Sequence, residues 1–339
     1  MILVTGGTGL AGSHLLLELT SQGKKVRALR RKSSSTDFVH HVFHAYADKP
    51  EEQLQQIEWI EGDVLDIFSL EDAMDGVKQV YHNAALVSFN PSDRDLMYRI
   101  NINGTANVVN AALKMGVQKL CHLSSIAALG RAEEDEITDE STEWVTSKQN
   151  SHYAISKYNG EREVWRGSAE GLDVVIILPS IIIGLADMSN GSMQLFKTVR
   201  QGIPFYTPGS NGYIGAHDLA RAQRFLMESD VVNEKYVLSA EDHGYKEVLG
   251  WIAEGLGKRK PGIRVNGSMA FISRYFFKIK SIVTGKPPII TRETARTAMR
   301  KYSYSSRKFI EVSHMKFTPI EETIRSICSI YMKNDFFGK

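Results

Sequence analysis

The chain begins with a glycine-rich stretch, VTGGTGLAGSHLL at residues 4–16, which constrains the fold more than any other feature. Its glycines fit the spacing G-x-G-x-x-G at Gly7, Gly9 and Gly12. A β-prone apolar run at 2–4 precedes them, and leucines at helical spacing follow. This order predicts a helix N-terminus whose free N–H groups face the pyrophosphate of a dinucleotide. The alternative is a glycine-rich turn that holds no ligand.

Segments typical of strands and of helices alternate along much of the chain. The strand-like runs are residues 2–4, 25–29, 57–61, 79–82, 119–123, 173–178 and 235–238. Helical patterns lie at residues 11–22, 70–74, 96–115 and 153–168. This alternation predicts an α/β protein with a doubly wound parallel Rossmann sheet.

The alternation becomes irregular after about residue 180, where glycine- and proline-rich loops such as FYTPGSNGYIG occur. We therefore expect a smaller C-terminal domain that binds the substrate and closes over the cofactor. The predicted Rossmann domain spans residues 1–178, and 214–240 return to it. The predicted substrate-binding domain comprises 179–213 and 241–339.

The composition favours a cytoplasmic enzyme that acts on small molecules. A formal net charge of +2 over 339 residues gives no indication of nucleic-acid binding. The longest apolar run, 174–186, is interrupted by Pro179 and Gly184, so a membrane span is not expected. The first strand starts at the initiator Met, so we expect no signal peptide. Two cysteines give no disulfide framework.

Three histidines lie in the long segment after the second predicted strand, at His40, His41 and His44. No carboxylate or cysteine completes a metal site with them, so the sequence predicts no metal. Solvated histidines on a mobile loop are the favoured interpretation.

The end of the second predicted strand has the sequence VRALRRKSS. Arg30 and Arg31 occupy the place where an acidic residue would bind the ribose 2′-hydroxyl of NAD. A guanidinium binds a 2′-phosphate, whereas a carboxylate would repel it. The sequence therefore predicts NADP rather than NAD, the alternative being that both arginines are solvated surface charges.

Two further strand ends supply candidate cofactor contacts. Asp63 follows the third strand and can accept from the adenine amino group, with the Val64 N–H beside it. The alternative is that Asp63 caps the next helix, although Asp66 is better placed for that. Ala84 and Ala85 follow the fourth strand, and such small residues let the ribose approach the backbone.

A tyrosine and a lysine are four residues apart on a predicted helix. Tyr153 and Lys157 share one face of this helix. A nearby cation is expected to lower the pKa of the phenol toward the working pH of a general acid–base. A serine hydroxyl from HLSSIAALG, at the end of the fifth strand, can hold a carbonyl oxygen.

With these motifs in this order, the sequence resembles the extended short-chain dehydrogenase/reductases. The matching stretches are T-G-G-T-G-L-A-G (5–12), D-V (63–64), N-A-A (83–85), N-I-N-G-T (101–105), S-S-I-A-A-L-G (124–130), Y-A-I-S-K (153–157) and L-P-S (178–180). The resemblance covers nearly the whole chain and is specific in the first 185 residues.

The resemblance implies roles for individual residues. Tyr153 would be the catalytic acid–base, and Lys157 would bind the nicotinamide ribose and tune Tyr153. Asn101 would hold a water in a proton relay. The serine position of the family's motif selects Ser125 over Ser124. The other implied cofactor contacts are Gly6, Gly9, Leu10, Gly12, Arg30, Arg31, Asp63, Val64, Ala84, Ala85 and Pro179.

Within this family the sequence is most similar to the dihydroflavonol reductase and hydroxysteroid dehydrogenase-like branch. Sugar-nucleotide epimerases usually have Arg-Pro and Gly-Pro where this chain has Leu178-Pro179 and Gly184-Leu185. Sugar-nucleotide dehydratases have Thr-Asp-Glu in place of Ser124-Ser125-Ile126. The resemblance thus implies an NADP-dependent reductase of ketones or aldehydes.

Two alternatives stay open, a nucleoside-diphosphate-sugar epimerase with tightly bound cofactor and a non-catalytic dinucleotide sensor. The family also implies a homodimer that pairs through the helices at 96–115 and 153–168. Residues 271–283 mix aromatic with basic side chains. We expect them to pack over the substrate pocket, with contact to a membrane surface as the alternative.

Overall fold

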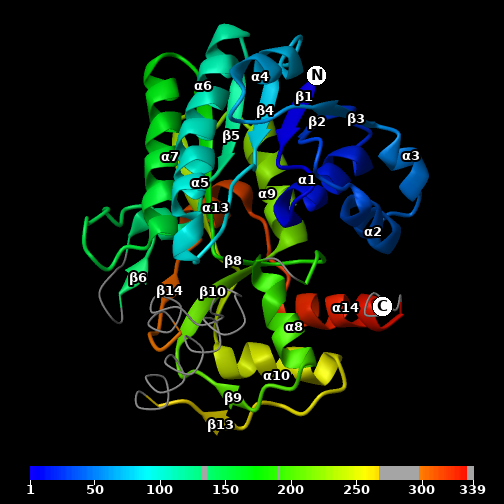
Figure 1. Cartoon of the computed structure of the whole chain (residues 1–339), viewed down its shortest axis with the longest axis vertical. Coiled ribbons are helices and arrows are strands. Elements are labelled where there is room, and N and C mark those ends of the chain that lie inside the picture. Colours follow the sequence, from blue (N-terminus) through cyan, green and yellow to red (C-terminus); the bar gives the residue numbers. More distant parts are fainter. Residues whose placement is uncertain (131–135, 189–190, 267–297, 334–339) are drawn as a thin grey trace.

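The computed structural model of the chain describes residues 1–130, 136–188, 191–266 and 298–333. A central sheet with helices on both faces forms the upper part of Figure 1, and a smaller group of strands and helices lies beneath it. The segment at 271–283, expected over the substrate pocket, lies outside the described residues.

Seven parallel strands form the central sheet, in the order β3–β2–β1–β4–β5–β7–β11. They are β1 (Ile2–Thr5), β2 (Val26–Arg30), β3 (Ile57–Glu61), β4 (Gln79–His82), β5 (Lys119–Leu123), β7 (Asp173–Pro179) and β11 (Glu234–Leu238). Each lies within one residue of its predicted bounds. The order runs outward from β1 on one side and from β4 on the other, so the prediction of a doubly wound Rossmann sheet is confirmed.

Alternate residues of the strands enter two hydrophobic cores, one on each face of the sheet. Val4 and Tyr81 belong to the first core, and Leu3 and Val80 belong to the second. The first core includes residues of α1 (Leu10–Ser21) and α9 (Ala216–Glu228). The second includes residues of α4 (Ile67–Ala73), α6 (Thr105–Lys114) and α7 (His152–Ala169). Because both faces are covered, the strands are nearly continuous apolar runs.

The single helix predicted at 96–115 is interrupted in the structure. After η1 (Pro91–Asp93), the region contains α5 (Arg94–Tyr98), the π-helical turn η2 (Arg99–Gly104) and α6. The widened turn brings Asn101 against α7, where a Cβ on Gly160 would lie 2.4 Å from the Asn101 carbonyl oxygen. Turns of this kind are frequent at functional sites, and apolar periodicity does not detect them.

The segment after β2 folds into α2 (Asp37–Tyr46) and α3 (Pro50–Leu54), where the sequence analysis expects a loop. Three apolar side chains at helical spacing are buried on α2: Val39, Val42 and Phe43. The expectation of a loop is wrong because this spacing is that of an amphipathic helix packed on the core.

The three histidines of this segment therefore lie on a helix. His40 and His44 are exposed, whereas His41 is half-buried with its ring against Phe38. No group of three or more His, Cys, Asp or Glu side chains could hold a metal ion in the described ranges.

The lower part of the molecule contains a three-stranded sheet in the order β12–β10–β8. Its strands are β8 (Ile181–Ile183), β10 (Ser210–Gly215) and β12 (Glu241–Gly244). The helices around it are η4 (Gly191–Met193), α8 (Gln194–Arg200), α10 (Tyr245–Gly255) and α14 (Ile320–Lys333). The remaining elements are η3 (Ile126–Leu129), β6 (Ile137–Thr138), β9 (Phe205–Tyr206), β13 (Ile263–Arg264), β14 (Ser303–Tyr304) and α13 (Arg307–Ser313). None of the described helices is both long and apolar enough to cross a membrane.

Fully buried histidines, His14 and His82 among them, make the fold sensitive to acid. Burial lowers the pKa of His14 to about 3, with repulsion from His217 adding to the shift. Burial also lowers the pKa of His82 to about 3. Unfolded histidine protonates near 6.5, so between these values the unfolded chain binds more protons than the folded chain. The free energy of unfolding therefore decreases as the pH falls through this window, by about 2 kcal/mol per ring at pH 5.

We expect urea unfolding at pH 7 and at pH 5 to show this loss. His14→Phe keeps an aromatic ring and should remove about 2 kcal/mol of the pH-dependent part. Burial raises the pKa of Glu161, which acts in the opposite direction, so the difference between the two proteins isolates His14. An identical pH dependence in both proteins would contradict the assignment.

Candidate active site

The glycine-rich turn joins β1 to α1, and its backbone requires two of its glycines. Gly6 has a φ of +72°, and a Cβ there would lie 2.6 Å from the Ala84 nitrogen. A Cβ on Gly12 would lie 2.1 Å from the Gly6 carbonyl oxygen. Helix α1 begins at Leu10 after Gly9, and no side chain caps its first turn. The N–H groups of that turn and the positive end of the helix dipole suit an anion such as a pyrophosphate.

Strands β4, β1, β2 and β3 are neighbours, so the residues that follow them share one edge of the sheet. Ala84 N donates to Thr5 Oγ1 at 3.2 Å, which fixes the end of β4 against the glycine-rich turn. Ala84 is half-buried and Ala85 is exposed. Arg30 is half-buried at the end of β2, and Arg31 is exposed directly after it. This edge thus holds the small residues and the arginines expected to contact the cofactor.

Asp63 and Val64 follow β3 at the same edge. Asp63 Oδ1 accepts from Leu65 N at 2.9 Å and so shapes its own turn. Asp66 Oδ1 accepts from Phe68 N at 3.1 Å and caps α4. The helix cap is therefore Asp66, as the sequence favours, while the contact of Asp63 with adenine stays a prediction. Val64 is buried.

Tyr153 lies in the first turn of α7, which Ser151 caps. The Ser125 side chain follows β5 and lies beside the Tyr153 phenol, and its Oγ accepts from Ala127 N at 3.2 Å. Lys157 lies one turn after Tyr153 and is buried. Its Nζ donates to the Leu123 carbonyl oxygen at 2.7 Å. The end of β5 and the start of α7 thus bring the three residues together.

The predicted lowering of the Tyr153 pKa by Lys157 is wrong for this structure. Burial raises the pKa of Tyr153, and the Ser125 hydroxyl beside it opposes that shift. Burial lowers the pKa of Lys157 to about 8, and the Glu161 carboxylate opposes it. Helical spacing does place the two side chains on one face, but the ammonium group is bonded to the Leu123 carbonyl. Tyr153 therefore keeps its proton at neutral pH.

The two adjacent serines have different partners. Ser124 Oγ donates to Glu161 Oε2 at 3.0 Å in a buried contact, whereas Ser125 contacts Tyr153. Trp165 Nε1 also donates to Glu161, at 3.3 Å. Glu161 is not among the residues predicted from the sequence, although its position four residues after Lys157 on one helix could have indicated it.

Asn101, in the π-helical turn, uses its side chain within the protein. Its Oδ1 accepts from Leu86 N at 2.7 Å, and its Nδ2 donates to Leu86 O at 2.9 Å. Nδ2 also donates to Ser156 Oγ at 2.9 Å. Both amide hydrogens are thus engaged, and Asn101 joins the segment after β4 to α7. Its role in holding a relay water stays a prediction.

Two further residues border this region. The Phe89 ring meets the Tyr153 ring edge to face, with centroids 5.9 Å apart, and Phe89 is 43% exposed. No motif indicates Phe89, because its contact with Tyr153 exists only in the folded chain. Pro179 is buried at the end of β7, the strand beside β5, so it lies at the same edge of the sheet.

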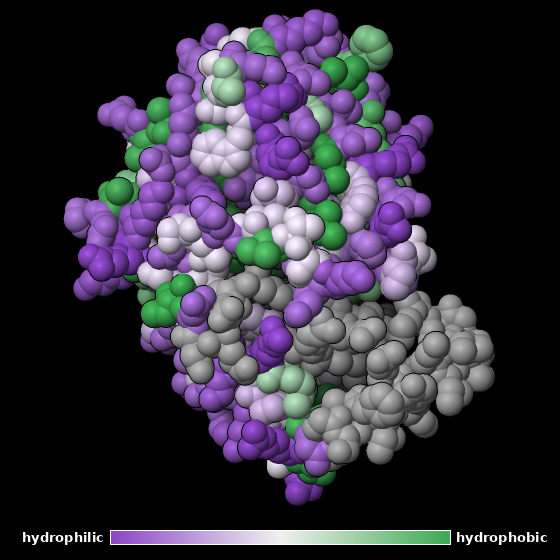
Figure 2. All heavy atoms as spheres, turned by 90° about the vertical axis from the view of Figure 1, so that its left-hand side faces the viewer, coloured by the Kyte–Doolittle hydropathy of each residue, from purple (hydrophilic) through white to green (hydrophobic). Residues whose placement is uncertain are grey.

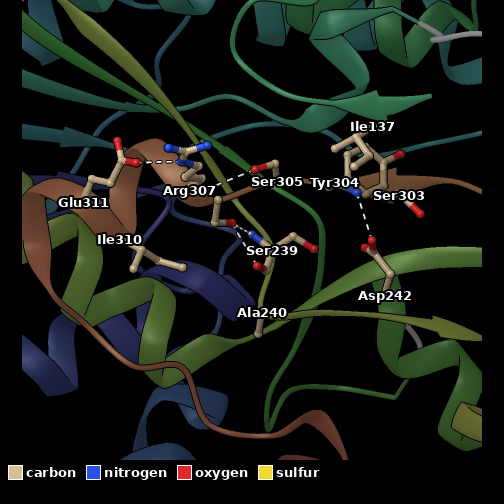
Figure 3. A pocket seen from close by; sticks show the side chains of 11 residues that line it. Ile137, Ser239, Ala240, Asp242, Ser303, Tyr304, Ser305, Arg307, Ile310 and Glu311 are labelled. Atoms are coloured by element: carbon tan, nitrogen blue, oxygen red, sulfur yellow. Dashed lines mark hydrogen bonds and ion pairs between the residues drawn. The ribbon is translucent and has the colours of Figure 1, made fainter.

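A cavity of about 540 Å³ lies elsewhere, between β6, β12, β14 and α13 (Figure 3). Polar residues that line it are Ser239, Asp242, Ser303, Ser305, Ser306, Arg307 and Glu311. Arg307 and Glu311 pair at 2.7 Å, and Asp242 accepts from Tyr304 N at 3.0 Å. None of the predicted catalytic or cofactor-binding residues lines this cavity.

Known proteins place the chain in a family. The family model described as NAD dependent epimerase/dehydratase family matches residues 2–239. The chain therefore belongs to the NAD-dependent epimerase/dehydratase family, and its resemblance to the extended short-chain dehydrogenase/reductases is confirmed. This makes it an oxidoreductase or epimerase of that kind.

Individual relatives show how far the similarity extends. Sterol demethylase protein B of Methylococcus capsulatus is 27% identical over 277 residues, which cover 78% of this chain and 76% of the relative. A putative dihydroflavonol 4-reductase of Synechocystis is 26% identical over 328 residues, covering 95% and 91%. The crystal structure of gox2253 has a TM-score of 0.81 at 26% identity, with 98% of each chain covered. The UDP-glucose 4-epimerase of Thermus thermophilus, solved with NAD, has a TM-score of 0.75 at 21% identity, with 98% of this chain and 99% of that chain covered; this likeness concerns the fold alone.

Proposed function

We propose that the chain is a cytoplasmic NADP-dependent carbonyl reductase that interconverts a ketone or aldehyde and an alcohol. The observation that carries this proposal is that Ser125, after β5, lies beside Tyr153 at the start of α7, with buried Lys157 one turn further on. These residues lie at the sheet edge that also holds the glycine-rich turn. Similarity to a putative dihydroflavonol 4-reductase over 95% of this chain supports the reductase class.

The cofactor would rest on the glycine-rich turn, because a Cβ at Gly6 or Gly12 would collide with the backbone there. The uncapped start of α1 at Leu10, after Gly9, would hold its pyrophosphate. The further residues that we propose to contact NADP are Arg30, Arg31, Asp63, Val64, Ala84, Ala85, Lys157 and Pro179. We also propose that the Rossmann part spans 1–178 with 214–240, and that 179–213 with 241–339 binds the substrate.

The cofactor, when bound, supplies the hydride, and the chain supplies the proton. Ser125 holds the carbonyl oxygen of the substrate, and Tyr153 donates its proton to that oxygen. A raised pKa suits this task, because the phenol must be protonated when reduction begins. Lys157, with a pKa lowered by burial to about 8, is mostly protonated at pH 7 and helps to recharge Tyr153. Asn101 would hold a water on that route.

The test is turnover of NADPH with a panel of aromatic, alicyclic and aliphatic carbonyls. A reductase consumes one NADPH for each carbonyl reduced. A nucleoside-diphosphate-sugar epimerase, the alternative, interconverts sugar nucleotides with no net consumption of NADPH. Interconversion of UDP-sugars with no reduction of any carbonyl would reject the proposal.

Arg30 and Arg31 should make the protein prefer NADPH over NADH. Replacing both by Ala should weaken NADPH binding by about 10- to 150-fold for each charged hydrogen bond lost, and leave NADH binding unchanged. Lys32→Ala, at the exposed neighbouring position, is the matched control. Fluorescence titration measures each affinity, and a preference of the unsubstituted protein for NADH would overturn the assignment.

A homodimer is a further prediction, with α6 and α7 of two copies in contact. The face that carries these helices is mostly hydrophilic (Figure 2). None of the exposed large apolar side chains in the described residues lies on either helix. The interface would therefore be polar and include groups such as Arg166, which donates to Asn110 at 2.8 Å. Light scattering at micromolar concentration should report a dimer, and a monomer would contradict this.

A further inference from the structure

A row of buried polar side chains crosses the sheet beneath the proposed active site. Thr5, His82 and His122 are register partners on β1, β4 and β5. All three are at most 1% exposed. Thr105 of α6 contacts this row, and its Oγ1 lies 3.0 Å from His82 Nε2. A buried polar group of this kind is costly unless its hydrogen bonds are satisfied.

The hydrogen bonds of this row fix the tautomer of His82. Thr105 Oγ1 donates its single hydrogen to the Asn101 carbonyl oxygen at 2.8 Å, so it can only accept from His82 Nε2. Nε2 therefore carries the proton, and Nδ1 of the neutral ring is free to accept. Nδ1 accepts from Thr5 Oγ1 at 2.8 Å, and Thr5 Oγ1 in turn accepts from Ala84 N at 3.2 Å.

The ring must be neutral for this chain of hydrogen bonds to hold. Burial, together with a smaller repulsion from the nearby Lys157 ammonium, lowers the pKa of His82 to about 3. His122 on the next strand is also neutral for these reasons, with His82 adding a smaller repulsion. Other titratable groups packed near Lys157 include Glu161, whose pKa burial raises. An imidazolium would lose the Nδ1 acceptor and break the bond to Thr5.

This series of hydrogen bonds joins the two halves of the proposed site, the cofactor-binding turn and the catalytic helix. One end is Ala84, against which the Gly6 turn packs. The other end is the π-helical turn of Asn101, whose side chain bonds to Ser156, the residue before Lys157. All hydrogen bonds point one way, from the Ala84 N–H through Thr5, His82 and Thr105 to the Asn101 carbonyl.

We propose that His82, in its Nε2–H tautomer, is a positioning residue that couples the cofactor-binding turn to the catalytic helix through Thr5 and Thr105. This inference rests on the proposed reductase function, because the helix it positions is the one that carries Tyr153 and Lys157. It assigns no chemical step to His82. It sets the position of Asn101, whose side chain holds Ser156 and thereby positions the start of α7.

The first test is independent of any activity. Proton–nitrogen NMR of protein labelled at histidine reports the tautomer and charge of each ring, and His82→Phe identifies the signal of His82. We expect an Nε2–H tautomer that does not titrate between pH 5 and 8. An Nδ1–H tautomer, or titration in that range, would overturn the proposal.

The second test uses His122→Phe as a matched control. His122 is register partner to His82, with ring centroids 5.2 Å apart, and neither of its nitrogens has a partner in the described part of the chain. We expect His82→Phe to lower kcat by roughly 10- to 100-fold, with little change in the KM for the carbonyl. NADPH affinity should fall by about 5-fold, as for one lost hydrogen bond. Equal kcat and equal NADPH affinity in the two variants would leave His82 a packing residue and overturn the proposal.

A second pair of variants guards against loss of folding in His82→Phe. Thr105→Val removes the hydroxyl at nearly constant volume, and Thr105→Ser retains it. Thr105→Val should reproduce the fall in kcat, and Thr105→Ser should retain most of the activity. If the unsubstituted protein reduces no carbonyl, the proposed function fails, while the tautomer and the NADPH affinities still decide whether His82 couples the two elements.

Discussion

Tyr153→Phe is expected to lower turnover of NADPH with a carbonyl by about 10²- to 10⁴-fold, the range typical of a lost general acid. Hydride delivery to a carbonyl leaves an alkoxide unless a proton arrives with it. Serine is too weak an acid to give that proton, and Lys157 is bonded to the Leu123 carbonyl. Tyr153, whose phenol burial keeps protonated, is the remaining donor among these residues.

The substitution should change little else. The Phe ring retains the edge-to-face contact that Tyr153 makes with Phe89, so folding and NADPH affinity should be close to those of the unsubstituted protein. Tyr158→Phe, on the same helix, is the matched control, because its ring stacks on Trp144 through carbon atoms that Phe keeps. Near-normal turnover in Tyr153→Phe, measured where proton transfer limits the rate, would reject the mechanism.

The sheet was predictable because most of its strands are short, largely apolar runs bounded by turn residues. Strand β7, for example, is buried from Val174 to Pro179, so its sequence DVVIILP has no polar face to confuse with another element. The glycine-rich turn was predictable for a related reason. Its spacing follows from the close approach of Gly12 to the Gly6 carbonyl, which only a residue without Cβ permits.

The features that were not predictable depend on contacts between distant segments. The π-helical turn at Asn101 forms where α6 meets α7 at Gly160, and apolar periodicity through 96–115 does not register it. The raised pKa of Tyr153 depends on burial in the folded chain, and the Lys157 ammonium is bonded to the Leu123 carbonyl of a distant strand. The spacing of two residues on a helix gives their common face, but it does not give the partner that each side chain chooses.

The neighbouring serines offer the sharpest separation of catalysis from stability. Ser125→Ala should lower turnover by about 10²- to 10³-fold, as for a lost donor to a developing oxyanion. The free energy of unfolding should fall by about 0.5–2 kcal/mol, because Ser125 Oγ caps η3 by accepting from Ala127 N at 3.2 Å. NADPH affinity should also be retained, so the loss would appear in kcat.

Ser124→Ala should reduce stability and leave turnover nearly unchanged. It leaves Glu161 Oε2 without its buried donor, which costs about 1–3 kcal/mol of the free energy of unfolding. Turnover should stay within a few-fold of normal, because the Ser125–Tyr153 contact does not involve Ser124. Urea unfolding and NADPH turnover should be measured on both variants. Ser125→Ala should lose more turnover, and Ser124→Ala should lose more stability. If Ser124→Ala is the variant that loses turnover, the active serine is Ser124, and it is Ser124 that holds the carbonyl oxygen of the substrate.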